Sequence, residues 1–184
     1  MGYCSEGYER MKTLSDKEAS TMNDKFILDA CCGGRCFWFN KKHPNTLYLD
    51  NRREEKGFEP QRPNFEINPD VVGDFTDLKF KDGSFKMVVW DPPHIVRLGN
   101  TSWMSRRYGM LGKNWKKALR AGFLECWRVL DDHGVLIFKW SEAEISVKTV
   151  LDLFTIEPLF GHTTGRGGKT KWMCFMKIPG EDLI

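Results

Sequence analysis

The chain has 184 residues, of which 41% are hydrophobic and 13% aromatic, and its formal net charge is +3 at pH 7. These values exclude a disordered chain and favour one globular domain. No apolar run reaches the roughly 20 residues of a membrane-spanning helix, and the polar N-terminus lacks the apolar segment of a secretory signal. We therefore expect a cytoplasmic protein with no membrane partner.

The predicted elements begin after a polar stretch. Residues 1–24 show no sustained apolar pattern, so we expect an extension outside the core and a single domain over residues 25–184. Apolar runs that end at glycine, proline or acidic residues predict strands, and apolar residues at helical spacing predict helices. In chain order we expect strands within 25–34, 45–53, 70–78 and 82–94, a helix over 113–130, a strand over 134–140, a helix over 141–154 and a β-hairpin over 161–178.

Two different signals predict the two helices. Trp115, Leu119 and Phe123 recur at near-helical spacing, which gives the first helix one apolar face. Ser141 and Glu144 have the spacing of a capping box, which predicts that the second helix begins there.

The alternation of strands and crossovers predicts an α/β fold. We expect a Rossmann-like, doubly wound, mostly parallel seven-stranded sheet with a C-terminal antiparallel hairpin. In such sheets ligands bind beyond the carboxyl ends of the strands. Four successive strand ends carry an acid, namely Asp29, Asp50, Asp74 and Asp91.

The first two of these acids have a spacing typical of nucleotide-binding folds. Glycines follow Asp29 at once, and glycine lets a backbone approach a ligand closely. Asp50 lies 21 residues after Asp29, near the distance at which an acid binds ribose hydroxyls. The pattern favours a ligand that contains a nucleoside.

The stretch VVWDPPHIV, residues 88–96, ends an apolar run with an acid, two prolines and a histidine. Two prolines cannot continue a helix and cannot donate to a sheet ladder. We therefore expect a rigid corner that presents Asp91 and His94 beyond the strand.

The segments LDACCGG and WDPPH together resemble class I S-adenosylmethionine-dependent methyltransferases over about residues 26–177. They are most similar to small phage- or prophage-type amino-methyltransferases with a D/N-P-P-Y motif, a group that includes adenine-N6 DNA methyltransferases. The resemblance implies S-adenosylmethionine as the cofactor: Asp29 and Gly33 would frame its methionine part, Asp50 its ribose, and Asp74 and Phe75 its adenine. The residues implied in cofactor binding are Asp29, Ala30, Cys31, Gly33, Asp50, Asn51, Asp74, Phe75 and Asp91.

The same resemblance makes Asp91, Pro92, Pro93 and His94 the catalytic corner. An exocyclic amine is a poor nucleophile because its lone pair is delocalised into the ring. The Asp91 carboxylate and the Pro92 carbonyl would accept its two N–H hydrogens, and the His94 ring would stack on the target base. The chain departs from the family pattern in two places, with Arg35 where the last loop glycine is usual and His94 where another aromatic residue is usual.

Two tracts, 92–124 and 158–180, contain basic residues and no acid. Such tracts are typical of phosphate contacts, and also of a solvated face. The segment that follows the corner is either a mobile lid over the substrate or an ordinary surface loop. The residues predicted to contact substrate are Trp103, Arg106, Arg107, Tyr108, Arg166 and Lys169.

The leading hypothesis is methyl transfer to an exocyclic amino group of a nucleic-acid base, with adenine N6 in DNA favoured over RNA. A duplex base would first have to be flipped out of the stack. The alternatives are an RNA base, a glutamine amide in protein, or a non-catalytic nucleotide-binding partner subunit. Asp91 counts against the last two, because enzymes of the glutamine type more often resemble N-P-P-Y at this corner and because the catalytic acid is present.

The six cysteines indicate reduced thiols. None forms a C-x-x-C pair, and no histidine stands at zinc-ligand spacing from the group within 31–36. We expect small packed side chains in a cytoplasmic protein and no bound metal. The cysteines are Cys4, Cys31, Cys32, Cys36, Cys126 and Cys174.

Overall fold

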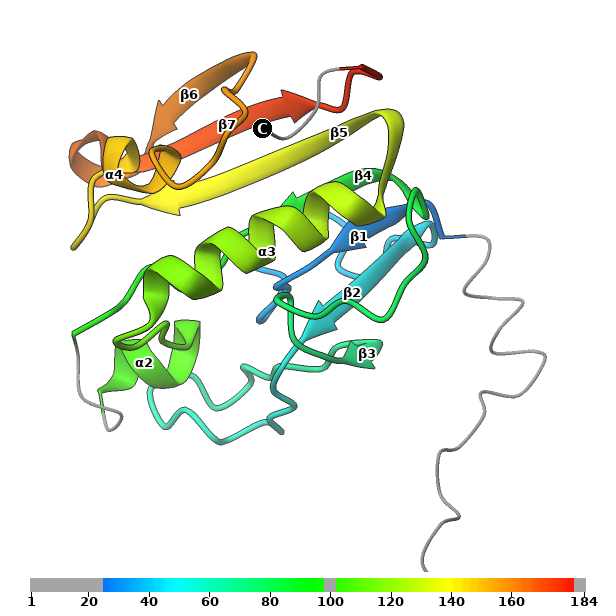
Figure 1. Ribbon diagram of the computed structural model, residues 1–184. Helices are drawn as coiled ribbons and strands as arrows, with labels where there is room; N and C mark the ends of the chain where they lie inside the picture. The colour runs from blue at the N-terminus through cyan, green and yellow to red at the C-terminus, as the bar shows by residue number, and fades with distance from the viewer. Residues whose placement is uncertain (1–24, 98–101, 181–184) are drawn as a thin grey trace, which may run out of the picture.

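The computed structural model describes residues 25–97 and 102–180, so the predicted extension over 1–24 lies outside the described residues. A seven-stranded sheet runs through the molecule in the order β3-β2-β1-β4-β5-β7-β6 (Figure 1). Every neighbouring pair is parallel except those of β7, which is antiparallel to β5 and β6. This confirms the predicted fold class. The strands are β1 (Ile27–Asp29), β2 (Thr46–Asp50), β3 (Val71–Val72), β4 (Phe85–Trp90), β5 (Leu130–Ser141), β6 (Phe160–Thr164) and β7 (Thr170–Met176).

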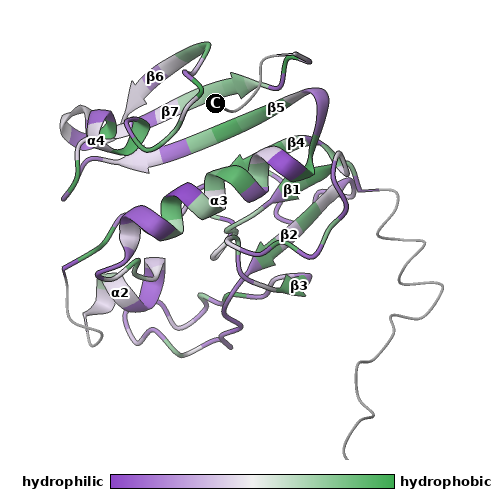
Figure 2. Ribbon diagram, in the orientation of Figure 1, coloured by the Kyte–Doolittle hydropathy of each residue, from purple (hydrophilic) through white to green (hydrophobic). Residues whose placement is uncertain are grey.

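Helix α3 (Trp115–Val129) packs on one face of this sheet. Its predicted apolar face is buried, with Leu119 and Phe123 at most 1% exposed. Gly122 lets the sheet approach closely, because a Cβ there would lie 2.5 Å from the Phe75 ring and 2.7 Å from the Trp90 ring. Figure 2 shows hydrophobic residues along the central strands and on α3. The core therefore lies directly beneath the strand that leads into the Asp91 corner.

The first connection, over 30–45, lies on the opposite face of the sheet and contains no helix. The connections over 51–70 and 73–84, also within the described residues, contain no helix either, but Phe75 and Leu78 of the last one pack in the core beside α3. Aromatic side chains of the first connection pack on the opposite face instead of a helix. Phe37 meets the Trp172 ring edge-on at 5.4 Å between centroids, and Trp38 meets the Tyr48 ring at 5.3 Å. We call this the aromatic face.

The second predicted helix is wrong at its start and in its length. Helix α4 spans only Val147–Leu151, and its N-cap is Ser146, whose Oγ accepts a hydrogen bond from the Thr149 amide at 3.2 Å. Ser141 cannot cap a helix because it is the last residue of β5, paired with Thr170 of β7. The Glu144 carboxylate lies elsewhere and accepts from the amides of residues 96 and 97, each at 3.1 Å.

A short helix, α2 (Trp103–Tyr108), stands where the sequence predicted a lid or a loop. It begins at Ser102, whose side chain accepts from the Met104 amide. A 3-10 turn over Arg166–Gly168 joins β6 to β7. None of the helices in the described part of the chain is long and apolar enough to cross a membrane.

Candidate active site

Three of the four strand-end acids converge at the carboxyl ends of β1, β2 and β4. Asp29 is fully buried and Asp50 is 1% exposed. The pKa of Asp29 is raised to about 7, mainly by burial and also by the negative charges of Asp91 and Asp50, while the hydrogen bonds from Trp38 and Cys31 act in the opposite direction. Carboxylates that interact in this way form one electrostatic unit, and that unit would be stabilised by a cation.

The glycine turn after β1 is tied to these acids through its backbone. The Cys31 amide donates to Asp29 Oδ1 at 3.3 Å, and the Gly33 amide donates to Asp50 Oδ2 at 2.8 Å. Gly33 has a φ of +46°, and nothing lies within 4 Å of the position that a Cβ would take. The turn is therefore open beside Gly33, which fits the predicted approach of a ligand.

The other two predicted residues near this turn differ in exposure. Ala30 is fully buried, and its amide continues the β1 ladder by donating to the Val89 carbonyl at 2.9 Å. Asn51 is exposed directly after Asp50. Asp50 Oδ1 also accepts from the Arg52 amide at 3.0 Å, so both carboxylate oxygens of Asp50 are oriented by backbone donors.

The Asp91 corner contains an ion pair that the sequence did not predict. Lys139 Nζ on β5 donates to Asp91 Oδ2, and the two side chains are 26% and 22% exposed. The register explains the pair, because Trp90 stands beside Phe138 and the next residues along the two strands are Asp91 and Lys139. Burial raises the pKa of Asp91, while the Lys139 charge and its hydrogen bond act in the opposite direction.

His94 follows the two prolines of the corner, and its ring lies near two aromatic rings. Its ring centroid is 5.9 Å from that of Tyr108 on α2 and 6.5 Å from that of Trp140 on β5. Burial lowers the pKa of His94, so the ring is mainly uncharged near neutral pH. Pro92 is buried and Pro93 half-buried, as expected of a fixed turn.

The fourth strand-end acid and its neighbour lie in different surroundings. Asp74 is exposed, and its Oδ1 accepts from both the amide and the hydroxyl of Thr76 at 2.8 Å. Phe75 is 8% exposed in the core, where its ring meets Trp90 edge-on at 5.7 Å. The predicted contact of this pair with an adenine ring remains a prediction.

Helix α2 is held to the rest of the molecule through the Arg107 side chain and the Arg106 carbonyl. The Arg107 side chain is buried and donates from Nε to Glu59 Oε2 at 2.9 Å. Arg52 Nη1 donates to the Arg106 carbonyl at 2.7 Å. Thus Arg107, predicted to contact phosphate, has its charge compensated inside the protein. Trp103 and Tyr108 are 50% and 42% exposed, as a stacking role requires.

The other two predicted substrate residues lie in the turn between β6 and β7, where Arg166 and Lys169 are exposed. Since β7 starts at Thr170 opposite Ser141, the last residue of β5, this turn lies at the same edge of the sheet as the Asp91 corner. The structure therefore brings these two residues and α2 to the edge where the acids converge.

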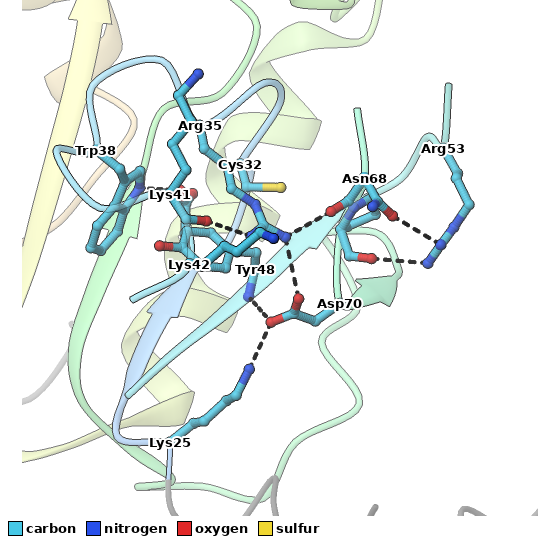
Figure 3. A network of polar contacts seen from close by, with 12 residues as sticks. Lys25, Cys32, Arg35, Trp38, Lys41, Lys42, Tyr48, Arg53, Asn68 and Asp70 are labelled. Atoms are coloured by element: carbon cyan, nitrogen blue, oxygen red, sulfur yellow. Dashed lines mark hydrogen bonds and ion pairs between the residues drawn. The ribbon is translucent and has the colours of Figure 1, made fainter. Parts of the chain in front are cut away.

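A pocket of about 500 Å³ opens on the aromatic face, beside β2. Figure 3 shows the polar network along its wall, in which Arg35 donates to the carbonyls of Lys41 and Asn68 at 2.6 and 2.7 Å and to Asp70 at 3.2 Å. Lys25 donates to the other oxygen of Asp70 at 2.8 Å. Arg35 has a φ of 53°, the left-handed conformation that usually favours glycine. Sequence reasoning identified the unusual residue at 35 but not this network.

The described cysteines are all free thiols. Cys32, Cys126 and Cys174 are buried and Cys31 is half-buried, whereas Cys36 is exposed. Burial and three neighbouring carboxylates raise the pKa of Cys31 well above its usual value, so the thiol is uncharged and unreactive at neutral pH. Over residues 25–97 and 102–180 no group of three or more metal-ligating side chains could hold a metal ion.

No protein-family model and no curated protein matches the chain. Solved structures match it over most of its length. The PH0226 protein from Pyrococcus horikoshii OT3 is 17% identical, with a TM-score of 0.50 over 82% of this chain and 81% of that chain. A mutant 16S rRNA (adenine(1408)-N(1))-methyltransferase from Catenulisporales acidiphilia is 10% identical, with a TM-score of 0.52 over 91% of this chain and 92% of that chain. The same mutant with cosubstrate SAM has a TM-score of 0.52 at 11% identity over the same shares. The chain has the fold of these proteins.

Proposed function

We propose that the protein is an S-adenosylmethionine-dependent methyltransferase that acts on an exocyclic amino group of a nucleic-acid base. One observation carries the proposal: Asp91, held by a proline corner at the end of β4, shares the sheet edge with the buried carboxylates Asp29 and Asp50. The fold shared with a solved methyltransferase structure that holds SAM supports the same reading.

The residues at this edge fit the cofactor. Three interacting carboxylates, one with a pKa raised to about 7, favour a ligand that brings positive charge. S-adenosylmethionine has an ammonium group and a sulfonium, and when bound it supplies an electrophilic methyl group. Asp50 retains acceptor capacity for ribose hydroxyls, since a carboxylate offers about four lone-pair sites. The open space beside Gly33 gives the ligand room to approach the backbone.

The corner suits a neutral, planar amine. The Asp91 carboxylate and the Pro92 carbonyl would accept its two hydrogens, which draws the nitrogen out of conjugation and directs its lone pair away from the ring. The Lys139 charge beside Asp91 disfavours a cationic amine such as a lysine side chain. The uncharged His94 ring would stack on the base.

A nucleic-acid substrate is favoured by what surrounds the corner. Trp103 and Tyr108 present exposed rings, and Arg166 and Lys169 are exposed cations at the same sheet edge. We propose adenine N6 in DNA as the first substrate to test. RNA is the second candidate, because the fold is shared with an enzyme that acts on adenine in 16S rRNA. A glutamine amide and a non-catalytic partner role are the remaining outcomes.

The test is transfer of radiolabelled methyl groups from S-adenosylmethionine to DNA, RNA and protein extracts supplied separately. Label in DNA supports the first candidate, and label in RNA or protein replaces it with the corresponding substrate. The Asp91→Ala variant should lose transfer while it binds the cofactor within a few-fold of wild type. Asp77→Ala is the matched control, because Asp77 is an exposed acid that pairs with Lys79 and has no predicted role at the site. Cofactor binding without transfer to any polymer would contradict the proposal and favour a partner role.

A further inference from the structure

Lys139 lies against the proposed catalytic acid. Its Nζ donates to Asp91 Oδ2, and the two residues lie on neighbouring strands one position beyond the pair of Trp90 on β4 and Phe138 on β5. It follows the apolar stretch 135–138 of β5, in which Ile137 and Phe138 directly precede it. A lysine at such a position carries a large desolvation cost unless its charge is used.

Two rings of the aromatic face also contact the Lys139 ammonium. Lys139 Nζ lies 5.5 Å from the Phe37 ring centroid and 5.6 Å from the Trp172 ring centroid, both within cation–π range. The two rings contact each other, and Trp172 Nε1 is fixed by a hydrogen bond to Thr164 Oγ1 at 3.1 Å. The ammonium is thus oriented by β4, by the first connection and by β7 together.

We propose that Lys139 is a positioning residue for the methyl transfer, which holds one oxygen of Asp91 and leaves the other to accept from the target amine. This inference rests on the proposed function. With Oδ2 engaged by Lys139, the amine hydrogen would be accepted by Oδ1. When the nitrogen gains a methyl group it must lose one proton, and that proton passes to Oδ1 and then to water.

The charged groups around Asp91 explain why a cation is needed there. Asp29 and Cys31 approach from the end of β1, His94 from the corner itself, and Lys139 from β5. Among these groups Asp29 is acidic, and the thiol and the imidazole are held in their uncharged forms by burial. Lys139 is therefore the cation that stabilises the buried Asp91 carboxylate.

The experiment compares Lys139→Met, Lys139→Gln and Lys139→Arg with wild type. Removal of the Lys139 charge should raise the pKa of Asp91, because the ammonium and its hydrogen bond no longer offset the effect of burial. The acid limb of the pH profile of kcat should move to higher pH in the Met and Gln variants, with kcat at neutral pH reduced at least about tenfold and the KM for cofactor nearly unchanged. Arginine should restore most of the rate. Lys148→Met is the control, since Lys148 on α4 is exposed and pairs with Asp152, the C-cap of that helix.

A second readout needs no activity. Carbon-13 NMR of the carboxyl groups, with Asp91 assigned from Asp91→Asn, should record the same upward shift in both uncharged variants; the Gln variant serves if the Met variant does not fold. No transfer by the wild-type protein would overturn the proposed function. Transfer by wild type with an unmoved acid limb and an unmoved Asp91 resonance in the Lys139 variants would overturn this inference alone.

Discussion

The guanidinium carbon of Arg35 lies 3.7 Å from the centroid of the Tyr48 ring, and so joins the first connection to β2 by a cation–π contact. The same side chain reaches two backbone carbonyls and Asp70 (Figure 3). These contacts connect the glycine turn to the segment before β3. In a doubly wound fold helices usually connect such strands, but the connections over 30–45 and 51–70 contain none. Arg35 thus stabilises a part of the fold that has no helices.

We predict that restoring the usual glycine at position 35 destabilises the protein. Arg35→Gly relieves a left-handed backbone worth about 1 kcal/mol but loses hydrogen bonds from a charged group and a cation–π contact, together worth more than about 2 kcal/mol. Arg35→Ala loses the same contacts and keeps the strain, so it should be the less stable of the two. Urea unfolding measures both, with the exposed Arg120→Ala as control. Equal stability of wild type and Arg35→Gly would contradict the prediction, because the network would then contribute no more than the relieved strain of about 1 kcal/mol.

Cofactor affinity should depend on pH through Asp29. Its carboxyl has a raised pKa of about 7 without ligand, and a cationic ligand lowers that pKa, so binding below pH 7 must release a proton. The Kd for S-adenosylmethionine should therefore be nearly constant above pH 7 and rise about tenfold for each pH unit below it. Calorimetric titration between pH 5 and 8 measures this. Asp29→Asn removes the proton-linked step, so a slope that persisted in this variant would assign the dependence to another group.

Arg107 and Glu59 should behave as a structural pair. Loss of one partner from a buried ion pair typically costs about 3 kcal/mol or more, because the other charge is left uncompensated. Arg107→Met should therefore unfold at lower denaturant than wild type, and the double variant Arg107→Met, Glu59→Leu should recover most of the loss. Nucleic-acid affinity of the double variant decides whether Arg107 also contacts phosphate: unchanged affinity would exclude that role.

Ser146, the N-cap of α4, and Ser141, the predicted N-cap, should differ in their contributions to stability. Ser146→Ala removes the hydrogen bond to the Thr149 amide and should cost about 1 kcal/mol. Ser141→Ala, at the end of β5, removes no cap and should cost less. Unfolding curves of the two variants under one condition provide the comparison. A larger loss in Ser141→Ala would contradict the observed helix start.

The sequence predicted what depends on neighbours along the chain. Apolar runs marked the strands, and the acids at their ends marked the edge where Asp29, Asp50 and Asp91 meet. The helix period of 115–129 was readable for the same reason. Each of these signals repeats within a few residues, so tertiary packing needs only to preserve it.

What the sequence could not predict depends on register between distant segments. Lys139 and Asp91 are 48 residues apart, as are Arg107 and Glu59, and no local pattern pairs them. The position of Lys139 at the end of an apolar stretch was the available signal, since a charge there requires a partner. The aromatic face that Phe37 and Trp38 build on β2 and β7 was likewise not predicted, because its rings meet across distant segments.

The helix-free connections should make the local stability of the sheet uneven. Strands β1 and β2 share the core of β4, α3 and β5 through Leu28, Leu47 and Leu49, but β1, β2 and β3 are joined by long connections that contain no helix. Amide hydrogens of β4 and β5 should therefore exchange with solvent more slowly than those of β1 to β3. The part of the sheet that carries Asp29 and Asp50 is thus the part whose opening a bound ligand would suppress most.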